Sequence, residues 1–191
     1  RKRRLSSDIR VQEEQKLRAR IERDYDRVLK THRVTGKPNR PMLEEALGNI
    51  DCQQTPYTLC LIRLARFNEL EQALGYRTAE DLLKQYLRLL NRYLKRTLGD
   101  RVIMINGYGI ATLDTVNHAF AMDRGSDPAQ DRELLETISH WLSENFREGR
   151  FSFSWAASMG VAYAPEHGTD AASVLSSAGS ASLDETRPMA I

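Results

Sequence analysis

Histidine and cysteine are the usual ligands of zinc and are frequent nucleophiles, and this chain of 191 residues has few of either. The four histidines show none of the short spacings that place two ligands on one metal ion. Cys52 and Cys60 fit neither a zinc-ligand nor a disulfide spacing, and Cys60 lies in an apolar run, which indicates a core residue in a reducing compartment. These spacings predict no bound metal and no cofactor. The histidines are His32, His118, His140 and His167.

A glycine-containing stretch, Asn106-Gly107-Tyr108-Gly109, is the next candidate for chemistry. Glycine-rich loops bind phosphate when a helix follows them, but this stretch lies between two short apolar runs, residues 102–105 and 110–113. Asn-Gly is a strong hairpin signal, because both residues tolerate a positive φ. We therefore expect the two runs to pair as a hairpin. Its tip would expose Tyr108 to a protein partner or to a base.

Charge is distributed unevenly along the chain. Residues 1–33 contain twelve Lys or Arg and six Asp or Glu, whereas the rest of the chain is slightly acidic. A basic segment on an acidic body argues against a nucleic-acid-binding face on the domain. The first four residues, Arg-Lys-Arg-Arg, resemble the cytoplasmic flank of a transmembrane helix, although a solvated helix end and RNA binding are alternatives.

The basic segment itself is predicted to be one helix, residues 5–32, because it lacks Pro and Gly and is rich in Arg, Glu and Gln. Its apolar residues fall mostly four apart, which indicates an imperfect coiled coil with a partner helix. The turn sequence at residues 35–41 ends it with Gly36 and two prolines. The apolar positions are Leu5, Ile9, Leu17, Ile21, Tyr25 and Val28.

The rest of the chain alternates helical and strand patterns. The helices are predicted from 3.6-residue periodicity and the strands from apolar runs. A late segment, residues 151–164, alternates bulky and small side chains and is predicted to be one long strand or a bent pair. The predicted helices are 42–47, 66–75, 78–97, 131–147 and one from Asp170 that ends before Pro188; the early strand is 58–64, and 115–130 is a polar loop.

This order of elements predicts an α+β fold. The hairpin requires antiparallel pairing, so we expect a central sheet with antiparallel strands, flanked by helices and carrying an N-terminal helical extension. No run of about 18 apolar residues is present, and no secretory signal peptide is visible at the start.

Four segments resemble the motifs of the GGDEF, or diguanylate cyclase, domain family, whose fold is nucleotidyl-cyclase-like. The family's entry motif D-x-L-T-G-L-x-N-R resembles HRVTGKPNR at 32–40, and its early strand and helix resemble RLARFNELEQALGYRTAE at 63–80. The signature G-G-D/E-E-F is matched to NGYGI at 106–110, and the late strand A-S-I-G-V-A-x-x-P to ASMGVAYAP at 157–165.

The resemblance implies a degenerate active site. Cyclases of this family join two GTP molecules with the help of two divalent metal ions, which need hard oxygen ligands. The two family carboxylates fall on Arg63 and Tyr108, and a catalytic Glu falls on Gly109. A guanidinium cannot bind Mg²⁺. We therefore expect a domain that is not an enzyme.

The resemblance also indicates nucleotide contacts. The guanine-reading positions fall on Glu71 and Glu80, and a phosphate-binding lysine falls on Asn68. Arg63 is predicted either to hold a nucleotide phosphate without metal or to pair with a neighbouring carboxylate. The predicted nucleotide-binding residues are Arg63, Asn68, Glu71, Glu80, Asn106 and Gly107.

Three functions follow as hypotheses. The first is an inactive regulatory module in bacterial cyclic di-GMP signalling, in which the helix relays a signal by homodimerisation to an output such as an EAL phosphodiesterase. The others are residual GTP binding or weak cyclase activity, and a scaffold for protein or RNA. The expected organisation is a signalling helix (1–33), the GGDEF domain (34–187) and the start of a linker (188–191). We expect a cytosolic part of an inner-membrane protein, below a transmembrane or sensor segment.

Overall fold

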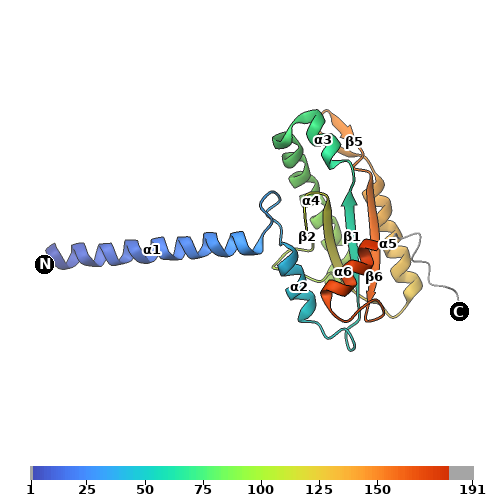
Figure 1. Cartoon of the computed structure of the whole chain (residues 1–191), viewed down its shortest axis with the longest axis horizontal. Helices are drawn as coiled ribbons and strands as arrows, with labels where there is room; N and C mark the ends of the chain where they lie inside the picture. Colours follow the sequence, from blue (N-terminus) through green and yellow to red (C-terminus); the bar gives the residue numbers. More distant parts are fainter. Residues whose placement is uncertain (1, 181–191) are drawn as a thin grey trace.

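The computed structural model describes residues 2–180, so the predicted linker 188–191 and the helix end before Pro188 lie outside the described residues. One long helix projects from a sheet that is covered by helices (Figure 1). The elements in chain order are α1 (Lys2–Lys30), α2 (Arg40–Gly48), β1 (Tyr57–Leu64), α3 (Phe67–Leu74), α4 (Tyr76–Leu98), a 3₁₀ turn (Gly99–Arg101), β2 (Ala111–Thr112), β3 (Asn117–Asp123), α5 (Pro128–Ser143), β4 (Phe146–Glu148), β5 (Phe151–Phe153), β6 (Ala157–Ala164) and α6 (Ala171–Ser180).

The main sheet has four strands in the order β2-β3-β1-β6. Strand β1 lies between β3 and β6 and pairs with both in antiparallel register. Both of its faces are covered: Cys60, Ile62 and Leu64 belong to one apolar cluster, whereas Tyr57 and Leu59 belong to another. A strand buried on both faces gives the near-continuous apolar run that predicted it. The α+β class with an antiparallel sheet is confirmed.

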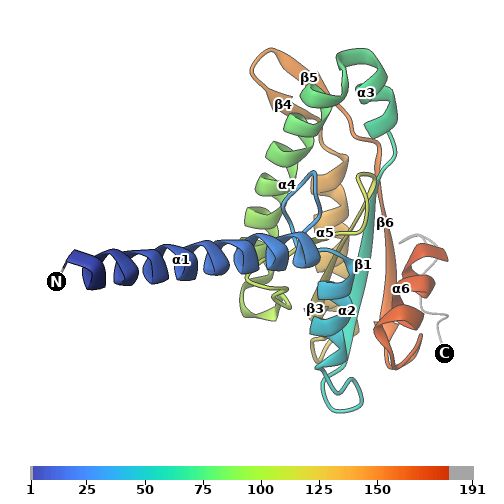
Figure 2. The same ribbon diagram turned by 60° about the vertical axis from the view of Figure 1, so that its left-hand side comes forward.

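Two helical layers enclose the sheet. One face is packed by α4 and α5, whose buried leucines form the larger core with β1 and β3. The opposite face is covered by α2 and α6 over small residues of β3 and β6, such as Ala119 and Ala162. Figure 2 shows α6 and α5 on the two sides of the strands. The small side chains of the late strand therefore permit the close approach that their alternation predicted.

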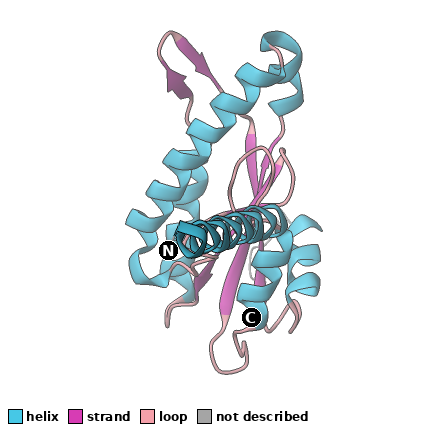
Figure 3. Cartoon of the chain, turned by 90° about the vertical axis from the view of Figure 1, so that its left-hand side faces the viewer, coloured by secondary structure: helices cyan, strands magenta, loops and turns pink. Residues whose placement is uncertain are grey.

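Helix α1 has no buried residue along its 29 residues. It leaves the domain without packing on it, and Figure 3 shows it end-on in front of the sheet and its helices. Its exposed apolar side chains are Leu5, Ile9, Val11, Leu17, Ile21, Tyr25, Val28 and Leu29. Within residues 2–180, no helix is both long and apolar enough to cross a membrane.

The predicted hairpin is only partly correct. Asn106 and Gly107 do form a tight turn with positive φ, closed by a bridge between Ile105 and Tyr108. The hairpin within the sheet, however, joins β2 to β3, and Ala111 pairs with Ala119. The segment 115–130, predicted to be a polar loop, contains β3. The Asn-Gly turn is thus a loop before β2.

The late segment is a bent pair of strands. Its first half, β5, pairs with β4 in a separate two-stranded sheet, and its second half, β6, joins the main sheet. Ala156 lies between them with a φ of +48°. The helix predicted at 131–147 is α5, which begins at Pro128 after the N-cap Asp127 and ends at Ser143. Because the helix ends four residues earlier than predicted, Phe146 is able to enter β4.

Candidate functional site

The end of β1 carries the candidate site, and Arg63 is its first residue. Its side chain is exposed, whereas the neighbouring Ile62 and Leu64 are fully buried. Arg63 lies opposite Asn117 of β3 and Ser158 of β6 in the strand registers. Within residues 2–180, Arg63 forms no ion pair, so the predicted pairing with a neighbouring carboxylate is not found. Its guanidinium is available to an anion.

The tip of the β2–β3 hairpin faces the same end of β1. The Leu64 amide donates a hydrogen bond to the carbonyl of Val116 at 2.8 Å. At this tip the carboxylate of Asp114 accepts from the amides of Val116 and Asn117, both at 2.8 Å, and from the Asn117 side chain. Burial alone would raise the pKa of Asp114, but these hydrogen bonds outweigh it and lower the pKa. The tip therefore presents an ionised carboxylate.

The Asn106–Gly107 turn lies elsewhere. The Gly109 amide donates to Oδ1 of Asn91 on α4 at 2.8 Å, and the Lys95 ammonium donates to the Gly107 carbonyl at 3.2 Å. Tyr108 lies against Lys37, 4.6 Å from the ammonium to the ring centre. The expectation that Tyr108 and Gly109 stand beside Arg63 is therefore wrong, because the strand register brings Asp114 and Asn117 there instead.

The remaining predicted site residues lie either near the end of β1 or in the Asn106–Gly107 turn. Asn68 and Glu71 lie on α3, which follows β1 directly, and Glu80 lies in the first two turns of α4. Helices α3 and α4 pack side by side. The structure thus groups these three residues at the same end of the sheet as Arg63. Asn106 and Gly107 belong to the loop that packs on the later part of α4.

His32, in the turn after α1, was not predicted as a site residue. Burial lowers its pKa, while the carboxylates of Asp114 and Glu80 act in the opposite direction. Both acidic groups therefore lie within electrostatic reach of His32, which links the turn, the hairpin tip and α4. The only sequence signal for this grouping was Asp114-Thr-Val-Asn117, a turn-forming stretch between two apolar runs.

A series of hydrogen bonds, buried at its centre, connects this turn to the hairpin tip. Thr35 Oγ1 donates to Thr112 Oγ1 at 3.0 Å, Thr112 Oγ1 lies 3.0 Å from His118 Nδ1, and His118 Nε2 lies 3.2 Å from the carbonyl of Thr115. A carbonyl only accepts, so Nε2 carries the proton and the neutral Nδ1 accepts from Thr112. Thr112 and His118 have no exposed surface.

The buried His118 in this series of hydrogen bonds predicts that the stability of the protein depends on pH. Burial lowers the pKa of His118 from 6.5 to about 4. Between pH 6.5 and 4 the His118 imidazole therefore binds a proton in the unfolded protein but stays neutral in the folded protein. The free energy of unfolding falls as pH drops through this range, by up to about 3 kcal/mol. Urea unfolding between pH 7.5 and 4 measures this loss. In His118→Gln the free energy of unfolding should depend less on pH. An unchanged pH dependence, or an equal reduction in the exposed control His140→Gln, contradicts this role of His118.

The family resemblance implies divalent metal ions, and the end of β1 offers few ligands for them. Within residues 2–180, no three His, Cys, Asp or Glu side chains gather as a metal site. At this end of the sheet the Asp114 oxygens already accept hydrogen bonds, and Glu71 and Glu80 lie on α3 and α4 without gathering with Asp114 around a common point. This donor set does not fit a pair of divalent ions.

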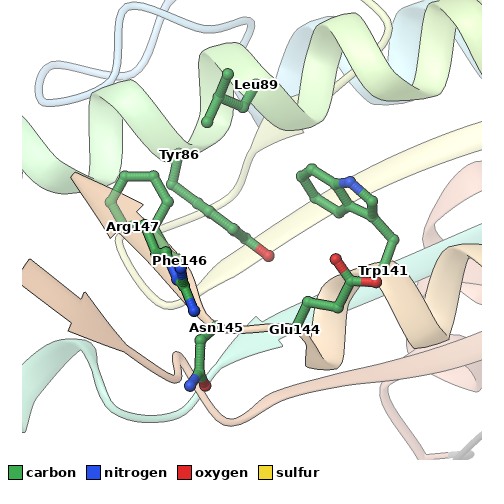
Figure 4. Close-up of a pocket in the computed structure, with 7 residues that line it drawn as sticks. All are labelled: Tyr86, Leu89, Trp141, Glu144, Asn145, Phe146 and Arg147. Atoms are coloured by element: carbon green, nitrogen blue, oxygen red, sulfur yellow. The ribbon is translucent and has the colours of Figure 1, made fainter. Parts of the chain in front are cut away.

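A separate pocket of about 160 Å³ opens between α4 and the segment from α5 to β4. Three aromatic rings line it, and the ring centres of Tyr86 and Trp141 lie 5.8 Å apart; Trp141 also stacks on Tyr93, outside the pocket lining, at 4.5 Å. No predicted site residue lines it. The lining residues, drawn in Figure 4, are Tyr86, Leu89, Trp141, Glu144, Asn145, Phe146 and Arg147.

Comparison with known proteins bears on the identity of the chain. Residues 29–187 match the sequence model of the family described as "Diguanylate cyclase, GGDEF domain". No curated protein matches the chain in a sequence search.

Solved structures share the fold. A sensory box/GGDEF family protein from Caulobacter crescentus is 20% identical with a TM-score of 0.63, over 82% of this chain and 97% of that one. The coiled coil and GGDEF domain of DgcB from the same organism, solved with c-di-GMP, is 17% identical with a TM-score of 0.63, over 93% and 89% of the two chains. An EAL/GGDEF domain protein from M. capsulatus is 18% identical with a TM-score of 0.59, over 74% and 84%.

These findings correct the prediction that the chain is not an enzyme. The family whose model matches is that of diguanylate cyclases, and the prediction of inactivity placed Tyr108 and Gly109 at a hairpin tip that they do not occupy. The matched residues span most of the chain and coincide with the sheet and its covering helices. The chain therefore belongs to the GGDEF domain family of diguanylate cyclases.

Proposed function

We propose that this chain is a signalling module of the cyclic di-GMP system, in which α1 pairs with a second copy and relays an upstream signal to the hairpin tip beside Arg63. The observation that carries this proposal is the continuous hydrogen-bonded path from the end of α1 to that tip. The coiled-coil GGDEF structure and the EAL/GGDEF protein among the similar structures support a helical input and an output domain such as an EAL phosphodiesterase.

Pairing of α1 follows from its exposed apolar residues. A helix of 29 residues that packs on nothing leaves its apolar side chains in water, although burying each such side chain stabilises by roughly 1.5–3 kcal/mol. A second α1 offers the matching surface, so the symmetric partner is another copy of the chain. The basic residues Lys2, Arg3 and Arg4 fit attachment to an upstream membrane or sensor segment.

The turn 31–39 joins α1 firmly to the sheet. The Asn39 side chain donates to the Leu29 carbonyl at 2.7 Å, and the Asn39 amide donates to the Lys30 carbonyl at 3.0 Å. The Thr112 amide then donates to the Pro38 carbonyl at 2.8 Å. A rotation of the last turn of α1 is thus transmitted to edge strand β2.

The hydrogen-bonded series Thr35–Thr112–His118–Thr115, which is buried at Thr112 and His118, continues this connection from the turn through β2 to β3. Each hydroxyl or ring nitrogen in it has its partner at 3.2 Å or less. A displacement of Thr35 would leave a buried donor or acceptor unpaired, at a cost of about 1–3 kcal/mol, so the tip is expected to follow the turn.

We further propose that the end of β1 binds guanine nucleotide. Arg63 would hold a phosphate, as a guanidinium without an ion-pair partner favours an anion. Glu80 would accept hydrogen bonds from guanine, with Asn68 and Glu71 on the neighbouring α3 as further contacts. The domain unit would be residues 34–187, with residues 1–33 as the signalling helix.

Nucleotide binding at this place predicts a weaker complex when Arg63 is removed. Calorimetry with GTP should show Arg63→Ala binding about tenfold or more weakly, since a charge-assisted hydrogen bond contributes about 1.5–3 kcal/mol. Arg150→Ala removes an exposed arginine from the β4–β5 turn and is the matched control. Equal affinities of wild type and Arg63→Ala for GTP would exclude this role.

The family activity is tested with the same protein. Incubation of the full chain with GTP and either Mg²⁺ or Mn²⁺, followed by chromatography for cyclic di-GMP, measures cyclase turnover directly. Turnover that depends on Asp114, shown by its loss in Asp114→Asn, would favour a cyclase with altered ligands.

A further inference from the structure

Cations without carboxylate partners gather where α4, the turn 31–39 and the loop 104–110 meet. We call Lys37, Arg88, Arg92 and Lys95 the basic cluster. The Lys37 ammonium lies 4.6 Å from the centre of the Tyr108 ring, and the Lys95 ammonium donates to the Gly107 carbonyl at 3.2 Å. The two lysines therefore flank the same short loop, although they come from distant parts of the chain.

The arginines belong to the face of α4 that meets this loop. Asn91 fixes that face, because its Oδ1 accepts from the Gly109 amide at 2.8 Å. Side chains three and four positions apart in a helix lie on one face, which places Arg88 and Lys95 with Asn91, and Arg92 beside them. The side chains of Arg88, Arg92 and Lys95 are exposed.

The electrostatics of the cluster are one-sided. Lys37 is partly buried; burial lowers its pKa, and the two charged groups that act on it, Arg88 and Lys95, lower it further. No Asp or Glu occurs in residues 33–39, 82–99 or 101–113, which include the loop, most of the turn and the part of α4 that meets them; Glu80 and Asp81 lie nearer the start of α4. Within residues 2–180, none of the four cations takes part in an ion pair.

Like charges held together around a partly buried lysine are unfavourable unless an anion joins them. A single carboxylate offers one charge, whereas a chain of phosphate groups offers several within a few ångströms. Ammonium and guanidinium groups bind phosphate oxygens through strong charge-assisted hydrogen bonds. We propose that the basic cluster is a binding site for a compact oligophosphate group, such as the phosphates of a nucleotide.

This site shares no residue with the one proposed at the end of β1, and the inference is independent of that function. The loop that carries Gly107 and Tyr108 is part of the site. Its Asn-Gly turn, first expected to lie at a catalytic tip, would instead help to present Tyr108 and the two lysines to the anion.

The test is calorimetric titration of the full chain with sodium tripolyphosphate. We expect saturable binding that weakens about tenfold or more in Arg88→Ala/Lys95→Ala, the equivalent of losing one charge-assisted contact. The control, Arg23→Ala/Arg150→Ala, removes the same charge from exposed positions elsewhere and should bind as wild type does. The charge-conserving Arg88→Lys/Lys95→Arg should retain binding.

Three outcomes would overturn the proposal. The first is no binding of tripolyphosphate by wild type at millimolar concentration. The second is an equal loss in the cluster variant and the control, which would reveal a general charge effect. The third is tight, strongly salt-dependent binding of a single-stranded oligonucleotide through Arg88 and Lys95, together with tripolyphosphate binding that does not saturate. This result would make the basic cluster a nucleic-acid surface. Because tripolyphosphate lacks guanine, Arg63→Ala should bind it normally, which separates this test from that of the β1 site.

Discussion

Aspartate in place of Ile9 or of Ile21 is expected to dissociate paired chains of this protein. Both isoleucines belong to the series of apolar residues spaced about four apart on α1, and more than half of each side chain is exposed in the single chain, at 53% and 57%. In a symmetric pair each substitution removes two buried side chains and buries two carboxylates. The loss of apolar burial alone is about 3–6 kcal/mol, so the dimer dissociation constant should rise at least about 100-fold.

Val11→Asp is the matched control for this prediction. Val11 is also on α1 and is 52% exposed, but it lies two positions from Ile9 and therefore on nearly the opposite side of the helix. Sedimentation equilibrium over a range of concentrations measures all three variants. A wild-type chain that stays monomeric, or the same weakening for Val11→Asp as for Ile9→Asp, would argue against pairing through the face of α1 that carries Ile9. Ile21 lies about 120° further round the helix, so Ile21→Asp tests whether the contact follows the drifting apolar residues.

The second large effect is on stability and concerns the ion pair between Arg101 and Asp131. Asp131 is buried, accepts from Arg101 Nη2 at 2.6 Å and also accepts from the Gly125 amide at 2.8 Å. Arg101 donates to the Asp123 carbonyl as well, so the pair joins the 3₁₀ turn, the end of β3 and the start of α5. Arg101→Ala leaves a buried carboxylate without its cation and should lower the free energy of unfolding by about 2–4 kcal/mol.

Chemical denaturation at pH 7 tests this second prediction, with Arg150→Ala as an exposed control that should change stability by less than about 0.5 kcal/mol. Gly125→Ala provides an independent check. A Cβ at residue 125 would lie 2.7 Å from Asp131 Oδ1, so this variant should also destabilise the protein. Equal stabilities for Arg101→Ala and Arg150→Ala would mean that water replaces the guanidinium without cost.

The sequence predicted the elements whose patterns are local. The periodicity of Leu83, Leu87, Leu90 and Leu94 marked α4, because a helix buried on one face repeats its apolar residues every three or four positions. The late strand was equally clear, and its bend is where Ala156 takes a positive φ. The family resemblance then joined these elements into the correct fold.

Local sequence patterns could not predict which two strands form the hairpin of the sheet. Apolar runs flank both Asn106-Gly107 and Asp114-Thr-Val-Asn117, and the run 110–113 is shared by the two, so either turn suited a hairpin. Pairing of β3 with β1 decides between them, since it buries Phe120 and Met122 in the core of α4 and α5. A contact between strands so far apart in sequence leaves no periodic signal.

The same limit applies to the candidate site. Arg63 and Glu80 could be identified because each falls on a functional position of the family motif around it. Asp114 and His32 meet them only through the folding of the hairpin and the turn. Sequence reasoning therefore placed Tyr108 and Gly109 where the fold puts Asp114 and Asn117.

Hydrogen–deuterium exchange at the hairpin tip tests most directly whether α1 communicates with the site. Amides 112–118 should exchange faster in Ile9→Asp/Ile21→Asp, where α1 is unpaired, than in wild type. The central amides of β6, residues 159–162, serve as the internal reference and should not change. Identical exchange at 112–118 in both proteins, at concentrations where only the wild type is dimeric, would contradict the relay from α1 to the tip beside Arg63.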